Sequence, residues 1–195
     1  VGDQWIGDGA DLIGGGEPQP EQDAIVFNSV WDYEHPLDSQ DPAGTDPDFQ
    51  STWMLPSYNH AGMFDQSGQA ILGYGTIDYG PILTNIGTPS GSHYTAYFRS
   101  TFTVDDPMVQ AGIEILNDDG AFVYIDGVEV LRNNIGAGAS DTYTAFALNH
   151  TYPDGTNVET ETRTFTIPDI DAGTHTIAVS VHQANTGSSD VGLDL

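Results

Sequence analysis

The residues best suited to chemistry in this chain are four consecutive positions, Asn117-Asp118-Asp119-Gly120. Carboxylate and amide oxygens are the ligands that hard cations such as Ca²⁺ prefer, and a glycine lets the backbone wrap around an ion. The same residue types also favour a plain turn, because Asn and Asp bond to nearby backbone and Gly accepts a positive φ. A catalytic carboxylate pair is the weakest interpretation, since 29 acidic residues in a chain of 195 make adjacent acids common. A metal site and a turn therefore both stay open.

A second acidic segment, residues 32–50, carries Asp38, Asp41, Asp46 and Asp48. Its spacing does not match the calcium loop of an EF-hand, which needs a central Gly and a final Glu. A solvated acidic loop is the favoured interpretation. The alternative is a second cation site built from these four carboxylates.

Aromatic residues are dense between positions 31 and 79, and three of them are candidates for glycan binding: Trp53, Tyr58 and Tyr79. Sugar-binding modules stack aromatic faces on pyranose rings and fix the hydroxyls with polar groups. Core packing and loop anchoring are the favoured interpretation of each aromatic residue singly. One or two exposed members would be enough for a glycan site.

Signatures of catalysis are missing from the sequence. There is no G-x-S-x-G or S-x-x-K segment, no pair of histidines has HExxH spacing, and the chain has no cysteine. A glycosidase needs two carboxylates flanking a cleft, which no sequence motif reports. We therefore expect a protein that is not an enzyme, and we interpret His182 as structural.

The charge balance excludes two classes of partner. The chain has three arginines and no lysine against 29 acidic residues, a formal net charge of −26. Such a surface repels nucleic acids and anionic membranes, and the absence of an 18-residue apolar run predicts no membrane insertion. The acidity is typical of a protein that stays soluble in high salt, binds divalent cations, or repels its own copies until cations screen the charge.

Alternating apolar residues and turn signals predict an all-β protein. The pair Asp126-Gly127 between two apolar runs is typical of a hairpin with a type I′ turn. In residues 94–104 the predicted strand places Ala96, Phe98, Phe102 and Val104 on one face. Other strands are expected over residues 24–31, 111–116, 121–125, 128–132, 142–148, 162–167, 174–183 and 191–195. Without βαβ alternation or a long amphipathic helix, these strands indicate an antiparallel β-sandwich.

Residues 1–23 are predicted to form an extended Gly- and Pro-rich N-terminal arm, and residues 24–195 the sandwich domain. The large apolar side chains of the arm are Trp5, Ile6, Leu12 and Ile13, too few to fold alone. An extended segment can add a strand to an open sheet edge of a neighbouring copy, with its apolar side chains in pockets. A head-to-tail contact that does not close makes a filament. The alternative is an arm that folds back on its own domain.

Four segments in a fixed order resemble a known family: GYG at 73–75, AYFRSTFTV at 96–104, DDGAFVYIDGVEVLRNN at 118–134 and HTIAVSVHQANTGSSDVGLDL at 175–195. They resemble the galactose-binding-like jelly-roll domains of bacteria, and they are also similar to PA14-type adhesin domains. The resemblance implies a jelly-roll sandwich over residues 24–195, Ca²⁺ held by Asp118 and Asp119, and an ion that helps to bind a sugar. The arm has no counterpart in those domains.

Two functions follow as expectations. The first is a calcium-stabilised, self-associating structural or adhesive protein that is secreted to the extracellular space or cell surface, since the chain starts at Val1 as an exported, processed protein would. The second is a carbohydrate-binding module or lectin-like domain that recognises cell-surface or matrix glycans. Calcium at or near the contacts between copies would favour the first.

Overall fold

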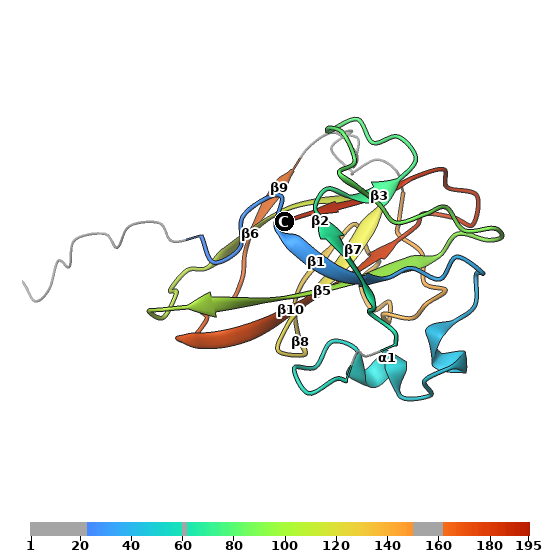
Figure 1. Ribbon diagram of the computed structural model, residues 1–195. Coiled ribbons are helices and arrows are strands. Elements are labelled where there is room, and N and C mark those ends of the chain that lie inside the picture. Colours follow the sequence, from blue (N-terminus) through green and yellow to red (C-terminus); the bar gives the residue numbers. More distant parts are fainter. Residues whose placement is uncertain (1–22, 60–61, 150–161) are drawn as a thin grey trace, which may run out of the picture.

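The computed structural model describes residues 23–59, 62–149 and 162–195, and the regular secondary structure of this part is almost entirely β-strand (Figure 1). Of the predicted arm, residues 1–22 lie outside this part, so the proposed association residues Trp5, Ile6, Leu12 and Ile13 are not described. No helix among the described residues is long and apolar enough to cross a membrane.

Two sheets make up the sandwich. The first has six strands in the order β2-β1-β5-β10-β7-β8: Gln66–Gln69, Val30–Glu34, Thr95–Val104, Gly173–His182, Gly120–Ile125 and Val128–Asn133. The second has five strands in the order β4-β3-β11-β6-β9: Thr84–Asn85, Leu72–Tyr74, Val191–Asp194, Gly112–Asp118 and Arg163–Thr166. All pairs are antiparallel except β3 with β4. The predicted all-β antiparallel sandwich is confirmed.

The main core lies between the two sheets. β5 and β10 pair along their whole length, from Thr95 opposite His182 to Val104 opposite Gly173. The alternating apolar residues of both strands point into this core, as the period-two pattern predicted. They are Ala96, Phe98, Phe102 and Val104 on β5 and Ile177, Val179 and Val181 on β10.

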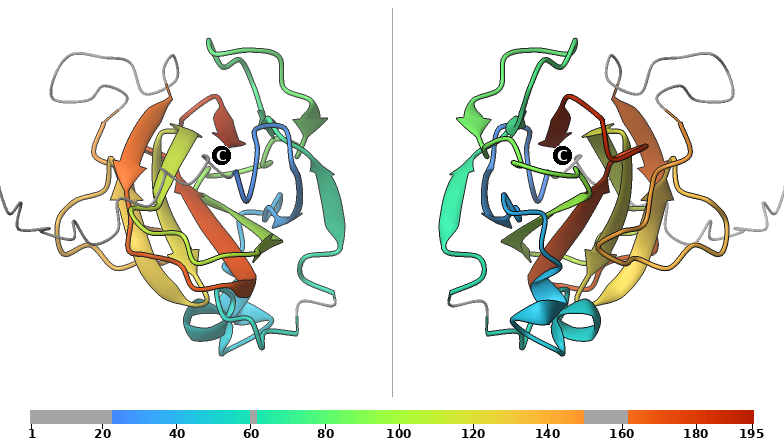
Figure 2. Two further views of the ribbon diagram at one scale, coloured as in Figure 1. Left: turned by 90° about the vertical axis from the view of Figure 1, so that its left-hand side faces the viewer. Right: turned by 90° about the vertical axis from the view of Figure 1, so that its right-hand side faces the viewer.

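A second apolar cluster covers the outer face of the six-stranded sheet. Tyr97 and Phe122 on the sheet pack against Phe49 and Trp53, which belong to or follow the short helix α1, Phe49–Thr52. The 3₁₀ turn η1, Pro42–Gly44, precedes it. Figure 2 shows both short helical segments at one end of the molecule. The sheet is consequently buried on both faces at this end, which a two-layer sandwich does not require.

The hairpin between β7 and β8 forms as predicted. Asp126 has φ 50° and Gly127 has φ 83°, the two positive values that a type I′ turn needs. Aspartate is one of the few residues that tolerate this conformation. Here its carboxylate also ties the turn to β10, because it accepts a hydrogen bond from the Thr176 backbone N–H at 2.8 Å.

Two strand predictions were wrong in position. Residues 142–148 form no strand, because this segment packs on the outer sheet face through Tyr143 and Ala147. Its backbone makes isolated hydrogen bonds instead of a ladder, such as the one that the Ala147 N–H donates to the Gln183 carbonyl. The first strand begins at Val30 instead of residue 24, since the chain turns at Asn28, whose φ is 67°.

Candidate functional site

The Asp118–Asp119 doublet lies where the chain crosses from one sheet to the other. Asp118 is the last residue of β6, in the five-stranded sheet, and Gly120 begins β7, in the six-stranded sheet. Asp119 alone links them, and the peptide bond between the two aspartates is cis. Both side chains have 0 % exposure. The doublet is therefore an enclosed crossover between sheets and not an exposed hairpin turn.

Neutral groups hold the second aspartate in place. Its Oδ2 accepts hydrogen bonds from the Ala184 backbone N–H at 2.7 Å and the Ser188 hydroxyl at 3.4 Å. Its backbone carbonyl accepts from the side-chain amides of Asn117 at 3.3 Å and Asn134 at 2.9 Å. These bonds come from β6, the segment after β8 and the segment after β10, so three parts of the chain fix the crossover.

The side chain of Asn117 belongs to this hydrogen-bond network around the doublet. Its amide nitrogen donates to the Asp119 carbonyl, and its Oδ1 accepts from the Asn133 amide at 2.8 Å. Asn117 is 1 % exposed and Asn133 5 %. The amide thus ties β6 to β8 and helps to fix the position of the doublet.

A third carboxylate lies near the doublet. Burial raises the pKa of the Tyr74 hydroxyl, and the charges of Asp190, Asp118 and Asp119 raise it further. That hydroxyl also bonds to His93 Nδ1 at 3.0 Å. Three acidic side chains therefore act on one phenol at this end of the sandwich. No sequence pattern groups Asp190 with the doublet. The pairing of Gly192 with Asp118 brings the start of β11 beside the end of β6.

The donor set suits a hard cation in part. Two adjacent carboxylates and nearby amide and backbone oxygens are Ca²⁺ chemistry, and the chain offers no thiolate. Within residues 23–59, 62–149 and 162–195, no group of three or more His, Asp or Glu side chains has the spacing of a metal site. An ion at the doublet would accordingly take two carboxylates and complete its shell with neutral oxygens or water.

The carboxylates of the acidic loop bond to nearby backbone. Asp38, Asp41 and Asp46 each accept a hydrogen bond from a backbone N–H two residues later, at 3.1, 2.9 and 3.2 Å. Asp38, Asp41 and Asp48 are exposed. These carboxylates cap turns and face solvent, and the structure does not gather them around a common point.

Only part of the predicted aromatic set is accessible to a glycan. Trp53 is 0 % exposed in the outer cluster, where it stacks edge-on against Tyr97 with ring centroids 4.9 Å apart, so its assignment as a sugar platform was wrong. Tyr58 is half-buried and donates to Asp46 Oδ2 at 2.9 Å. Tyr79 is 43 % exposed and is the one candidate of the three with a free face.

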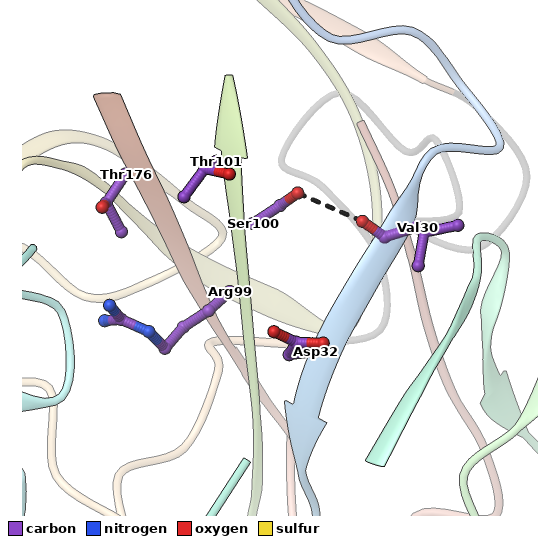
Figure 3. A pocket seen from close by; sticks show the side chains of 6 residues that line it. All are labelled: Val30, Asp32, Arg99, Ser100, Thr101 and Thr176. Carbon is purple, nitrogen blue, oxygen red and sulfur yellow. Dashed lines mark hydrogen bonds between the residues drawn. The ribbon is translucent and has the colours of Figure 1, made fainter. Parts of the chain in front are cut away.

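A small polar pocket of about 120 Å³ opens over β1, β5 and β10. Figure 3 shows the Arg99 side chain extending away from Asp32, while the Ser100 hydroxyl bonds to the Val30 carbonyl. The Arg99 guanidinium donates to the backbone carbonyls of Trp53 and Leu55, the latter at 3.0 Å. Arg99 thus anchors the segment after α1 to the sheet, and its guanidinium bonds to the backbone of the protein itself.

A buried polar network was missed by sequence reasoning. The Asp141 carboxylate accepts hydrogen bonds from the Tyr124 hydroxyl, the Ser180 hydroxyl and His182 Nε2, each at 3.0 Å. His182 Nδ1 lies 3.0 Å from the Thr95 hydroxyl. His182 and Ser180 have no exposed surface. This Ser-His-Asp set is sealed beneath the loop that carries Asp141, which fits the structural interpretation of His182.

No known family model matches this chain, and no curated protein matches it either. Two solved structures align with it at low TM-scores. The crystal structure of Ruminococcus gnavus beta-glucuronidase aligns with a TM-score of 0.36 and 9 % identity, covering 86 % of this chain and 23 % of that one. The same enzyme in complex with uronic isofagomine aligns with a TM-score of 0.34 and 9 % identity, covering 92 % and 30 %. The chain spans less than a third of those proteins, and the fold remains established by its own strands as an antiparallel β-sandwich.

Proposed function

We propose that the protein is a non-catalytic, calcium-stabilised, extracellular structural or adhesive β-sandwich that associates with copies of itself through its N-terminal arm. The observation that carries this proposal is the enclosed doublet of Asp118 and Asp119 at the sheet crossover. Burying a carboxylate costs on the order of several kcal/mol unless nearby charge or hydrogen bonds compensate it. A Ca²⁺ ion supplies two positive charges and accepts carboxylate and amide oxygens.

Two of the three arginines, Arg99 and Arg132, bond elsewhere in the structure, so neither supplies the doublet with a compensating positive charge. Arg99 bonds to carbonyls near α1, and Arg132 pairs with Glu129 at 2.6 Å on β8. With a formal net charge of −26, close association of copies requires cations between or within them. Calcium at the doublet would stabilise the folded domain, and screening cations would reduce the repulsion between copies.

Calcium binding is tested by thermal unfolding of the full chain in CaCl₂, MgCl₂ and EDTA. A ligand at one hundred times its Kd stabilises by about 2.7 kcal/mol, which for a domain of this size raises Tm by roughly 5–11 °C. The double variant Asp118→Asn/Asp119→Asn should lose this rise. The matched control is Asp105→Asn/Asp106→Asn, an adjacent pair that is exposed. A rise that both double variants keep, or that the wild type lacks, contradicts the proposal.

Self-association is tested by sedimentation velocity of the full chain with CaCl₂ and with NaCl at equal ionic strength. Calcium-dependent polymers are the expected result, and imaging should show whether they are filaments. Equal polymerisation in NaCl would mean that screening alone drives assembly. Monomers under every condition would refute the structural function.

Carbohydrate binding is the second candidate, and the exposed ring of Tyr79 favours it. The proposal predicts glycan binding that depends on calcium and weakens in Tyr79→Ala. Tyr58→Phe, which keeps its ring but loses the bond to Asp46, is the control.

A further inference from the structure

The small polar pocket over β1, β5 and β10 opens where the backbone pairing of β1 with β5 ends. The last pair of this ladder is Asp32 opposite Arg99. Further along β1 a side chain takes over from the backbone, because the Ser100 hydroxyl donates a hydrogen bond to the Val30 carbonyl at 3.1 Å (Figure 3). The pocket beside this bond has a volume of about 120 Å³.

The lining of the pocket is mostly polar and comes from three strands. Its members are Val30 and Asp32 on β1, Arg99, Ser100 and Thr101 on β5, and Thr176 on β10. Thr101 and Thr176 are opposite each other in the ladder between β5 and β10. The pocket therefore presents one carboxylate, one guanidinium and three hydroxyls beside one apolar side chain.

The Thr176 side chain is the observation that points to a ligand. Thr176 is 7 % exposed, and its backbone N–H donates to Asp126 at 2.8 Å. Within the described part of the chain, no hydrogen bond involves the Thr176 hydroxyl. Enclosed polar groups of folded proteins nearly always have a partner, which is the protein, a water or a ligand. The partner of this hydroxyl is therefore expected in the pocket.

Charge favours a neutral ligand. Because Asp32 and Arg99 are opposite each other, an ion of either sign would meet a like charge. The net charge of −26 repels anions further. The Arg99 guanidinium also donates to the Trp53 and Leu55 carbonyls, which holds it at one wall. An uncharged polar molecule avoids both repulsions.

The available groups match the hydroxyls of a sugar. A carboxylate accepts several hydrogen bonds at once, and a Ser or Thr hydroxyl both donates and accepts. Adjacent sugar hydroxyls also donate and accept, so they can pair with these groups together. The carbon side of a sugar ring needs an apolar contact, which Val30 offers at 60 % exposure.

The size of the pocket limits the ligand to one ring. A single water needs about 10–15 Å³ of such a volume, so 120 Å³ holds several waters or one sugar residue. No aromatic residue is among the described residues that line the pocket. Binding would depend on hydrogen bonds and one valine, and we expect a Kd on the order of 1 mM.

We propose that this pocket binds one neutral sugar residue, with the Asp32 carboxylate accepting hydrogen bonds from adjacent hydroxyls and with Thr101 and Thr176 bonding to the same ring. The inference rests on the second candidate function, carbohydrate binding, and gives it a site apart from Tyr79 and from the doublet. It does not depend on self-association.

Saturation-transfer difference NMR of the full chain in CaCl₂ tests the site, because it detects weak ligands of monomers and polymers alike. The probes are the methyl glycosides of glucose, galactose and mannose, titrated to about 50 mM, with the corresponding uronates as anionic counterparts. Asp32→Asn and Thr176→Val each remove a partner and keep the size of the side chain. The control Thr103→Val makes the same change at an exposed threonine of β5 that does not line the pocket.

The expected result is binding of at least one neutral glycoside, with its uronate at least tenfold weaker. Asp32→Asn should raise Kd at least about tenfold and Thr176→Val at least about threefold, whereas Thr103→Val should change it less than about twofold. A uronate that binds as tightly as its neutral parent would overturn the inference. Binding kept by both pocket variants and lost in Tyr79→Ala would overturn it while leaving carbohydrate binding intact. Absence of binding to every probe would overturn it as well, and carbohydrate binding would then depend on Tyr79 alone.

A second pair of variants guards against a folding defect in the first. Thr101→Phe fills the mouth of the pocket from an exposed position, and Thr103→Phe is its control on the same face of β5. Phenylalanine is favoured in strands, so both variants should fold, with urea unfolding as the check. Thr101→Phe should abolish detectable binding, and Thr103→Phe should keep it. Equal binding by the two variants would contradict the proposed site.

Discussion

Replacing Asp141 by alanine should cost more stability than any exposed acid in this acidic protein. The Asp141 carboxylate accepts three hydrogen bonds of 3.0 Å, from Tyr124, Ser180 and His182. The His182 and Asp141 side chains are 0 % and 6 % exposed. Alanine would leave three enclosed donors without their acceptor and would release the loop that seals the outer cluster.

The expected loss follows from these three bonds. A buried donor left unsatisfied costs about 1–3 kcal/mol, so three donors set an upper range of about 3–9 kcal/mol. Water entering the vacated site and relaxation of the loop reduce this, and removal of one partner from a buried pair typically costs about 3–5 kcal/mol. We expect a loss of about 3–5 kcal/mol for Asp141→Ala. Asp141→Asn keeps one acceptor oxygen and should lose less.

Equilibrium unfolding in urea at fixed calcium concentration measures this loss. The control Asp105→Ala removes an exposed carboxylate and should change the free energy of unfolding by no more than about 0.5 kcal/mol. The midpoint should shift without a change in slope if the outer cluster unfolds together with the sandwich. A loss below about 1 kcal/mol would refute the reasoning, because the three donors would then have found water or other acceptors.

Three further predictions concern backbone and pH. Gly127→Ala should lose about 1–3 kcal/mol in urea unfolding, since φ is 83° and an added Cβ would lie 2.4 Å from a Leu55 methyl carbon; Gly136→Ala, whose added Cβ meets nothing closer than 3.6 Å, should lose less than about 1 kcal/mol. The hydrogen bond to Asp126 raises the pKa of His175, so its stabilisation is complete below the ordinary histidine pKa and is lost as pH rises through the raised value; Asp126→Asn should flatten this part of the pH profile. Burial lowers the pKa of His35 to about 4, so stability should fall as pH drops from the ordinary value towards 4, and His35→Gln should remove that slope.

The elements that the sequence predicted well are those with local causes. The alternation in β5 and β10 and the positive φ values of Asp126 and Gly127 depend on residues adjacent in the chain. The outer cluster was not predicted, because Trp53 lies in a segment without periodicity and Tyr143 was assigned to a strand that does not form. The burial of both depends on a sheet face formed by distant strands. An aromatic residue in such a loop can equally well bind a ligand or fill a core, and only the fold decides which.

The candidate site, too, could be predicted from the sequence only in part. Residue types identified the doublet of Asp118 and Asp119, but nothing in their types indicated that it would form an enclosed crossover between two sheets. Asp190 reaches the same end of the sandwich through β11, 71 to 72 residues further along the chain. Contacts at such separation follow from strand order, which alternation alone does not determine.

The charge balance makes the role of cations separable by experiment. Even if each of the three arginines neutralised one acid, the formal charge would remain −26, so any salt should stabilise the folded chain by screening. A calcium site at the doublet would add a stabilisation that depends on the identity of the ion and not on ionic strength. Stability measured against NaCl should rise gradually, whereas calcium should add a saturable rise at concentrations too low to screen. If the rise is saturable and vanishes in Asp118→Asn/Asp119→Asn, the buried carboxylates bind the ion; if calcium acts only as its ionic strength predicts, the acidity of this protein is a property of its surface alone.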